Sequence, residues 1–177
     1  MDFLHQMGEA ALASRLRRVS ERLLQDAGRV YRKAGLDFEP RWYPLFHLLQ
    51  ERSPLSVTQA AHALGLTHPA ISQMASLLIR RGLVEGLADE RDGRRKLLSL
   101  TREGEDLARR LDPVWKALSE ATLEILGPAS GSFLDQLGDL EEAVERQEFE
   151  AAALRRLVSS TAPSALATEE AAGDTGA

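Results

Sequence analysis

The chain has 177 residues, a formal net charge of −5 and an ordinary 44% hydrophobic content, which fits one compact unit with a small appendage. It has no cysteine, which excludes disulfides, thiolate zinc sites and thiol-based redox sensing. No apolar run approaches the roughly 20 residues of a membrane-spanning helix, and no leader segment opens the chain, so we expect a cytoplasmic protein without a membrane partner.

The first predicted element is a long amphipathic helix that begins near Phe3 and continues to Val30. Its apolar residues recur every three or four positions and therefore form one stripe: Leu12, Leu16, Val19, Leu23, Ala27 and Val30. A second, shorter helix is predicted between Pro40 and Ser53, because both ends carry residues that interrupt helices.

Two short helices joined by a tight turn are predicted next. Ser56 and Gln59 form a capping box, in which each side chain bonds the other residue's backbone amide. Gly65 suits the positive φ that ends a helix. Thr67 or His68 can cap the second helix, because the following proline is tolerated only in the first turn.

The second of these helices has an unusual outward face. Its inward positions are apolar, whereas the outward positions carry short hydrogen-bonding groups and one cation: Thr67, His68, Ser72, Gln73, Ser76 and Arg80. Such a face suits the major groove of DNA, where glutamine can bond adenine in a bidentate way. Taken alone, an ordinary solvated helix face is the alternative.

A two-stranded hairpin is predicted from Leu83 to Leu100, with a charged loop at its tip. The tip carries four basic side chains that could enter a minor groove or only be solvated: Arg91, Arg94, Arg95 and Lys96. Residues 55–102 hold 7 basic and 4 acidic side chains, whereas residues 103–177 hold 6 and 16. The central segment can therefore face phosphate although the whole chain is acidic.

The C-terminal part is predicted to hold two long helices and a tail. Thr101 can cap the first helix, and Pro113 is expected to kink it. Gly127 and the following proline separate it from a second helix that continues to Val158. Residues 159–177 contain too few large apolar side chains to fold, so we expect a disordered tail.

In this order and spacing, these motifs resemble the MarR family of bacterial winged-helix transcription regulators. The resemblance rests on residues 55–73, on Arg81-Gly82-Leu83-Val84 and on residues 89–101, followed by Gly104. It implies a mainly α fold with a small β-hairpin. The implied domains are an N-terminal dimerisation helix (1–34), a winged helix-turn-helix DNA-binding domain (39–101) and C-terminal dimerisation helices (102–158), followed by the tail (159–177).

The resemblance also implies a function and its residues. A homodimer would bind a pseudo-palindromic operator in double-stranded DNA as a repressor. Ser72, Gln73 and Ser76 would face bases, Arg94 would enter the minor groove, and phosphate would lie near Ser56 and Thr58. A small aromatic or anionic effector would release the DNA by binding near a group of ring-bearing residues, although rings at helical spacing usually pack in the core: Trp42, Tyr43, Phe46 and His47.

Other function classes find little support in the sequence. There is no phosphate-binding glycine loop and no nucleophile motif, so no enzymatic activity is expected. The four histidines show no metal-ligand spacing, and we expect neither a metal nor another cofactor. A helical scaffold that binds only protein remains the alternative, and a weak dependence of binding on salt would identify it.

Overall fold

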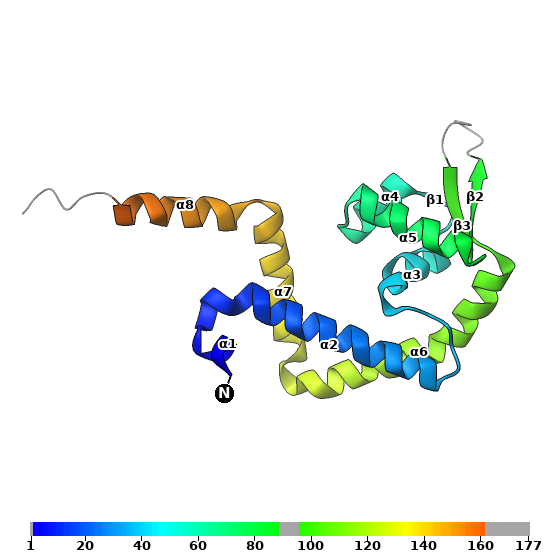
Figure 1. Cartoon of the computed structure of the whole chain (residues 1–177), viewed down its shortest axis with the longest axis horizontal. Helices are drawn as coiled ribbons and strands as arrows, with labels where there is room; N and C mark the ends of the chain where they lie inside the picture. Colours follow the sequence, from blue (N-terminus) through cyan, green and yellow to red (C-terminus); the bar gives the residue numbers. More distant parts are fainter. Residues whose placement is uncertain (1, 89–95, 162–177) are drawn as a thin grey trace, which may run out of the picture. The chain divides into compact units, whose positions relative to one another are not determined.

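The computed structural model describes residues 2–88 and 96–161. The chain divides into two compact units, Met1–Thr122 and Leu123–Ala177. As predicted, it is mainly helical with one small sheet (Figure 1). Within the described residues, no helix combines the length and the apolar character needed to cross a bilayer.

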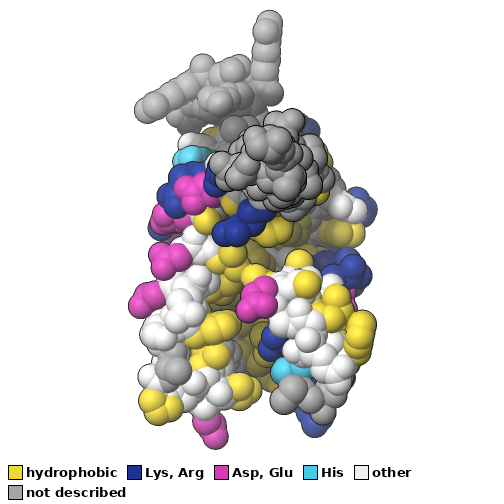
Figure 2. Space-filling model, turned by 90° about the vertical axis from the view of Figure 1, so that its left-hand side faces the viewer, with side chains coloured by type: hydrophobic (Ala, Val, Ile, Leu, Met, Phe, Trp, Pro, Cys, Tyr) yellow, Lys and Arg dark blue, Asp and Glu magenta, His cyan; other side chains and the backbone are white. Residues whose placement is uncertain are grey.

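The N-terminal helix begins later than predicted. A short helix α1 (Phe3–Gln6) and a 3₁₀ turn η1 (Gly8–Ala11) precede α2 (Leu12–Lys33). Gly8 has a φ of 57°, which a right-handed helix cannot contain, so the prediction of one continuous helix was wrong at this point. Along α2 the predicted apolar stripe is largely exposed in the single chain, at Leu12, Leu16, Val19, Leu23 and Val30. Hydrophobic side chains also lie open on the face drawn in Figure 2.

An aromatic core joins α2 to the next elements, η2 (Pro40–Trp42) and α3 (Tyr43–Arg52). Phe38 packs edge-on against the rings of Tyr31, Trp42 and Phe46, at centroid distances of 5.3–5.6 Å. Trp115, from α6 (Arg102–Leu126), donates from Nε1 to the Tyr31 hydroxyl at 3.0 Å. This hydrogen bond ties α2 to α6 inside the core.

The helices α4 (Val57–Leu64) and α5 (His68–Arg80) lie with α3 beside a three-stranded antiparallel sheet (Figure 1). The predicted hairpin is present as β2 (Val84–Ala88) and β3 (Lys96–Leu100), paired from Val84↔Leu100 to Ala88↔Lys96. A further strand, β1 (Leu55–Ser56), pairs with β3 on its other side. The sequence analysis missed β1, because two residues are too few to show an alternating pattern.

The helix α6 continues through Pro113, which is tolerated inside it, and its ribbon changes direction part-way along (Figure 1). In the second unit, η3 (Gly127–Ala129) leads into α7 (Ser130–Glu145) and then α8 (Glu148–Thr161). The prediction of one uninterrupted helix to Val158 was wrong, because Gln147 takes a φ of 58° and breaks it.

The predicted tail also begins too early. Residues 159–161 are the last residues of α8, where the Ser159 hydroxyl donates to the Arg155 carbonyl at 2.9 Å. Small polar residues are compatible with the end of a helix, where the last carbonyl groups need partners. The rest of the predicted tail, residues 162–177, lies outside the described residues.

Candidate nucleic-acid interface

The unit α4–turn–α5 is fixed by local hydrogen bonds that the sequence predicted. The Ser56 amide donates to Gln59 Oε1 at 2.9 Å, and the Gln59 amide donates to Ser56 Oγ at 3.2 Å, which completes the capping box. Gly65 ends α4 with a φ of 61°. Of the two alternatives for the cap of α5, Thr67 is the one present, since its Oγ1 accepts from the Ala70 amide at 3.4 Å.

One side of α5 anchors it and the other is open. Ile71, Ala75 and Leu78 are buried in the core, as predicted from their spacing, and Met74 is half-buried. All the predicted outward residues of this helix and its cap are exposed: Thr67, His68, Ser72, Gln73, Ser76 and Arg80. The structure thus brings these six side chains together on one accessible surface, which we call the α5 polar face.

Hydrogen bonds within the α5 polar face leave most of its groups available. The Ser76 hydroxyl donates to the Ser72 carbonyl at 2.8 Å, an ordinary bond to the preceding helical turn. Among the described residues, the side chains of Gln73 and Arg80 have no hydrogen-bonding or ionic partner. A glutamine amide and a guanidinium on a rigid helix can donate to base edges or to phosphate without first breaking an internal bond.

The two predicted phosphate contacts before α4 differ in accessibility. Thr58 is exposed in the first turn of α4. Ser56 is only 7% exposed, and its hydroxyl both donates to Gln59 Oε1 and accepts from the Gln59 amide. Its side chain is therefore occupied in capping α4, which leaves Thr58 as the accessible hydroxyl at this helix start.

The predicted basic tip lies mostly outside the described residues. Lys96 opens β3 and is exposed. Arg91, Arg94 and Arg95 fall in the segment 89–95, which the structure does not describe. The strands that bear this segment are nevertheless fixed by their register, from Val84↔Leu100 onward.

One anchoring residue escaped the sequence analysis. Arg81 follows α5 immediately and forms an ion pair with Asp37, while its guanidinium carbon lies 5.2 Å from the centre of the Trp42 ring. The cation thereby fastens the end of α5 to the segment before α3. Its partner is 44 positions away in the chain, so no local pattern indicates the contact.

The predicted effector residues separate into two groups. Trp42 and Phe46 are 1% and 0% exposed and belong to the core. Tyr43 is 38% exposed and stacks on His47 at a centroid distance of 5.3 Å, and both rings pack edge-on against Trp115. Only Tyr43 and His47 could therefore touch a ligand without rearrangement of the core.

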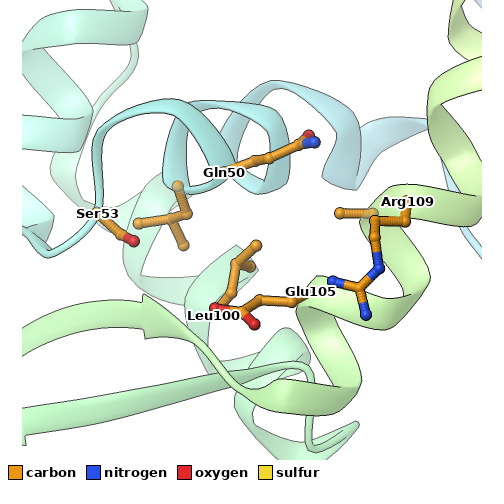
Figure 3. A pocket seen from close by; sticks show the side chains of 7 residues that line it. Gln50, Ser53, Leu100, Glu105 and Arg109 are labelled. Carbon is orange, nitrogen blue, oxygen red and sulfur yellow. The ribbon is translucent and has the colours of Figure 1, made fainter.

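A small pocket of about 180 Å³ lies between α3, the end of β3 and α6 (Figure 3). Its lining combines apolar side chains (Leu49, Leu100 and Ala108) with polar and charged ones (Gln50, Ser53, Glu105 and Arg109). None of the four predicted effector residues lines this pocket.

Two further observations bear on the chemistry of this region. Burial raises the pKa of Tyr31 above its ordinary value of 10, an effect that the hydrogen bond from Trp115 partly offsets. Among the described residues, no three histidine, aspartate or glutamate side chains lie close enough together to hold a metal ion.

The chain resembles known transcriptional regulators in sequence and in structure. A model of the MarR family matches residues 36–95. The repressor CouR, solved bound to a 23-mer DNA duplex, is 26% identical, with a TM-score of 0.63 over 76% of this chain and 96% of CouR. The chain is thus similar to MarR-family regulators in the sequence of residues 36–95 and in fold. Its α4–turn–α5 unit and three-stranded sheet thus form the winged helix-turn-helix of a DNA-binding transcriptional regulator.

Two other regulators extend this comparison. PcaV of Streptomyces coelicolor, a regulator solved in complex with its natural ligand, is 25% identical, with a TM-score of 0.62 over 81% of this chain and 97% of PcaV. The HTH-type transcriptional regulator PetP of Rhodobacter capsulatus is 27% identical over 115 residues, which are 64% of this chain and 69% of PetP. Both relatives are regulators of transcription.

Proposed function

We propose that this protein is a MarR-family repressor that binds a pseudo-palindromic DNA operator as a homodimer. The α5 polar face carries the proposal, because it presents accessible donors and acceptors on a helix whose opposite side is locked in the core. A helix of this kind fits the major groove, which is about 12 Å wide.

The proposed contacts divide by chemistry. Ser72, Gln73 and Ser76 face bases, because they lie in the middle of the open side of α5. Positioning contacts to phosphate come from the ends of the helix pair and from the wing: Thr58, Thr67, His68, Arg80, Arg91, Arg94, Arg95 and Lys96. Among the wing residues, Arg94 is our choice for the minor groove. Ser56 acts indirectly in this scheme, by capping α4.

The exposed apolar residues of the long helices support the homodimer. α2 leaves five large apolar side chains of its stripe open, and the second unit exposes others, among them Phe133, Val144, Phe149 and Leu154. Open apolar surface of this kind is typical of a protein–protein interface. We assign residues 1–34 and 102–158 to the dimer, with residues 39–101 as the DNA-binding part.

Operator release by a small aromatic or anionic effector is the second element of the proposal. The stacked, partly exposed rings of Tyr43 and His47 support it, and the ligand-bound PcaV is a precedent within the family. Such a ligand can release DNA only by binding the DNA-incompetent state more tightly. A screen of aromatic acids against the protein–operator complex tests this element, and no change in affinity with any compound would remove it.

Selection of bound fragments from random duplex DNA tests the main proposal. We expect a pseudo-palindrome whose half-sites lie about 10 base pairs apart, since recognition helices of a dimer lie about 34 Å apart. Affinity should fall steeply with salt, with a logarithmic slope of about −0.9 per phosphate contact. A monomeric protein, or one that ignores duplex DNA at low salt, would instead favour a scaffold that binds only protein.

A further inference from the structure

The helix α5, the β2–β3 hairpin and the helix α6 meet at one small joint. The chain leaves α5 at Gly82, which has a φ of 70°, forms the hairpin, and returns beside Gly82 and Leu83 before α6 begins. There the Thr101 amide donates to the Leu83 carbonyl at 3.1 Å. The exit from the recognition helix, the base of the wing and the start of α6 are thus held together within a few residues.

The Thr101 hydroxyl closes this joint from both sides. Its Oγ1 donates to the Gly82 carbonyl at 2.6 Å and accepts from the Gly104 amide at 3.0 Å. The same side chain therefore caps α6 and fastens it to the residue that follows α5. A cap alone would need only the second of these bonds.

Gly104 allows the close approach on which the joint depends. A Cβ atom added to Gly104 would lie 2.1 Å from the Leu83 carbonyl oxygen and 3.2 Å from its carbon. The first distance is far shorter than any allowed contact, and the obstacle is backbone rather than a flexible side chain. The first turn of α6 is therefore pressed directly against the chain leaving α5.

From this geometry we infer that Thr101 and Gly104 are positioning residues, which fix the angle between the recognition helix α5 and α6 and thereby set the spacing of the half-sites. The inference rests on the proposed function, since it requires a dimer that reads two half-sites. Neither residue touches DNA in this scheme. Both act through the direction of α5.

The length of α5 makes the joint effective. Its 13 residues span about 20 Å. A rotation of about 10° at the joint would move the far end of α5 by about 3.4 Å, which is one base-pair step of B-DNA. A rigid joint therefore selects one spacing, and a loose joint would accept neighbouring ones.

Thr101→Val tests the inference, because it keeps the shape of the side chain and removes both hydroxyl bonds. Thr101→Ser keeps the hydroxyl and should behave like the parent. Ser99→Ala is the matched control, since it removes a hydroxyl from β3, just before Thr101. The 3.4 Å bond of this hydroxyl leads to Ser53, away from the joint.

The first measurement needs no DNA. The chain has no cysteine, so spin labels can be placed at Leu66→Cys, before α5, and at Lys116→Cys, on α6, both of which are exposed. We expect a narrow distribution of label distances in the parent, in Thr101→Ser and in Ser99→Ala, and a clearly broader one in Thr101→Val. An equally narrow distribution in Thr101→Val would overturn the inference, whatever the protein binds.

The second measurement selects operators from a library in which half-site spacing varies. Thr101→Val should bind operators whose spacing is one base pair shorter or longer with an affinity within about threefold of that for its best operator. Its affinity for random DNA should stay within twofold of the affinity of the parent protein. If the parent selects one spacing and Thr101→Val selects it as sharply, the inference fails and the proposed function stands. If the parent binds no duplex, the proposed function fails, and with it the claim about spacing.

Amide hydrogen exchange of the unaltered protein keeps the test decisive if Thr101→Val does not fold. The Gly104 amide, bonded to Thr101 Oγ1, should exchange as slowly as amides in the buried part of α6. Exchange as fast as that of an exposed helix end would overturn the inference.

Discussion

Gln73 occupies the centre of the α5 polar face, and its amide has no partner among the described residues. We expect Gln73→Ala to weaken binding to the selected operator by about 1–3 kcal/mol and to relax preference at one base position. Binding to random duplex DNA should not change, because that binding depends on phosphate contacts. Titration of both DNAs measures the difference. An equal loss on both DNAs would contradict base reading by Gln73.

Gly104 gives a prediction about stability that does not involve DNA. Gly104→Ala should lower the free energy of unfolding by about 1–3 kcal/mol, because its Cβ has no space beside the Leu83 carbonyl. Gly131→Ala, inside α7 where a Cβ would meet nothing within 4 Å, should be neutral or stabilising by up to about 1 kcal/mol. Urea denaturation of both variants measures the contrast, and similar effects at the two positions would refute it.

At the scale of elements, the start of α4 depends on Ser56. Ser56→Ala removes the acceptor for the Gln59 amide and leaves Gln59 Oε1 with one donor fewer, so we expect a loss of about 1 kcal/mol in unfolding free energy. Chemical denaturation measures this free energy of unfolding. Ser20→Ala, at an exposed position in the middle of α2, should change it by less than about 0.5 kcal/mol. Equal effects of the two substitutions would show that the capping box contributes nothing.

The features that the sequence predicted are those determined by residues close to one another in the chain. The capping box, Gly65 and the apolar side of α5 each depend on residues within one or two helical turns, and all were confirmed. The breaks at Gly8 and Gln147 were missed, because the apolar stripes continue on both sides of them and periodicity says nothing about one positive φ. Strand β1 was missed because its pairing is with residues about 40 positions later.

The candidate site shows the same division between local and distant causes. The exposure of the α5 polar face follows from helical spacing alone. The burial of Ser56 depends on the pairing of β1 with β3, and the role of Arg81 depends on Asp37 and Trp42. Distant contacts of this kind leave no pattern in the sequence. The division of the ring-bearing residues into buried and exposed members likewise required the packing of α6 onto α3.

At the scale of the molecule, the bond from Trp115 to Tyr31 links α2 with α6, and the burial of the Tyr31 phenol makes stability depend on pH in the alkaline range. Burial raises the pKa of Tyr31, so the folded state favours the neutral phenol. This contribution is fully present below pH 10, the ordinary pKa, and is lost as pH rises through the higher pKa of the folded state. Unfolding free energies measured between pH 8 and pH 11 should therefore decline.

Tyr31→Phe separates this contribution from other alkaline titrations. The variant should lose about 1–2 kcal/mol at pH 7, because the indole N–H of Trp115 would remain buried without an acceptor. It should also decline less than the parent above pH 10. Parallel curves for the two proteins at high pH would show that Tyr31 does not control the decline.

If Ser76 faces a base as we propose, the bond from its hydroxyl to the Ser72 carbonyl restricts the operator sequence. A serine whose only proton is already donated can accept from DNA but cannot donate to it. The base facing it must then offer an exocyclic amino group, adenine N6 or cytosine N4, whereas thymine O4 and guanine O6 present a second acceptor. In a two-fold symmetric complex, the Ser76 of each protomer would face one base, and these two bases lie at symmetry-related positions on opposite strands. An operator with thymine or guanine at both of these positions is therefore disfavoured.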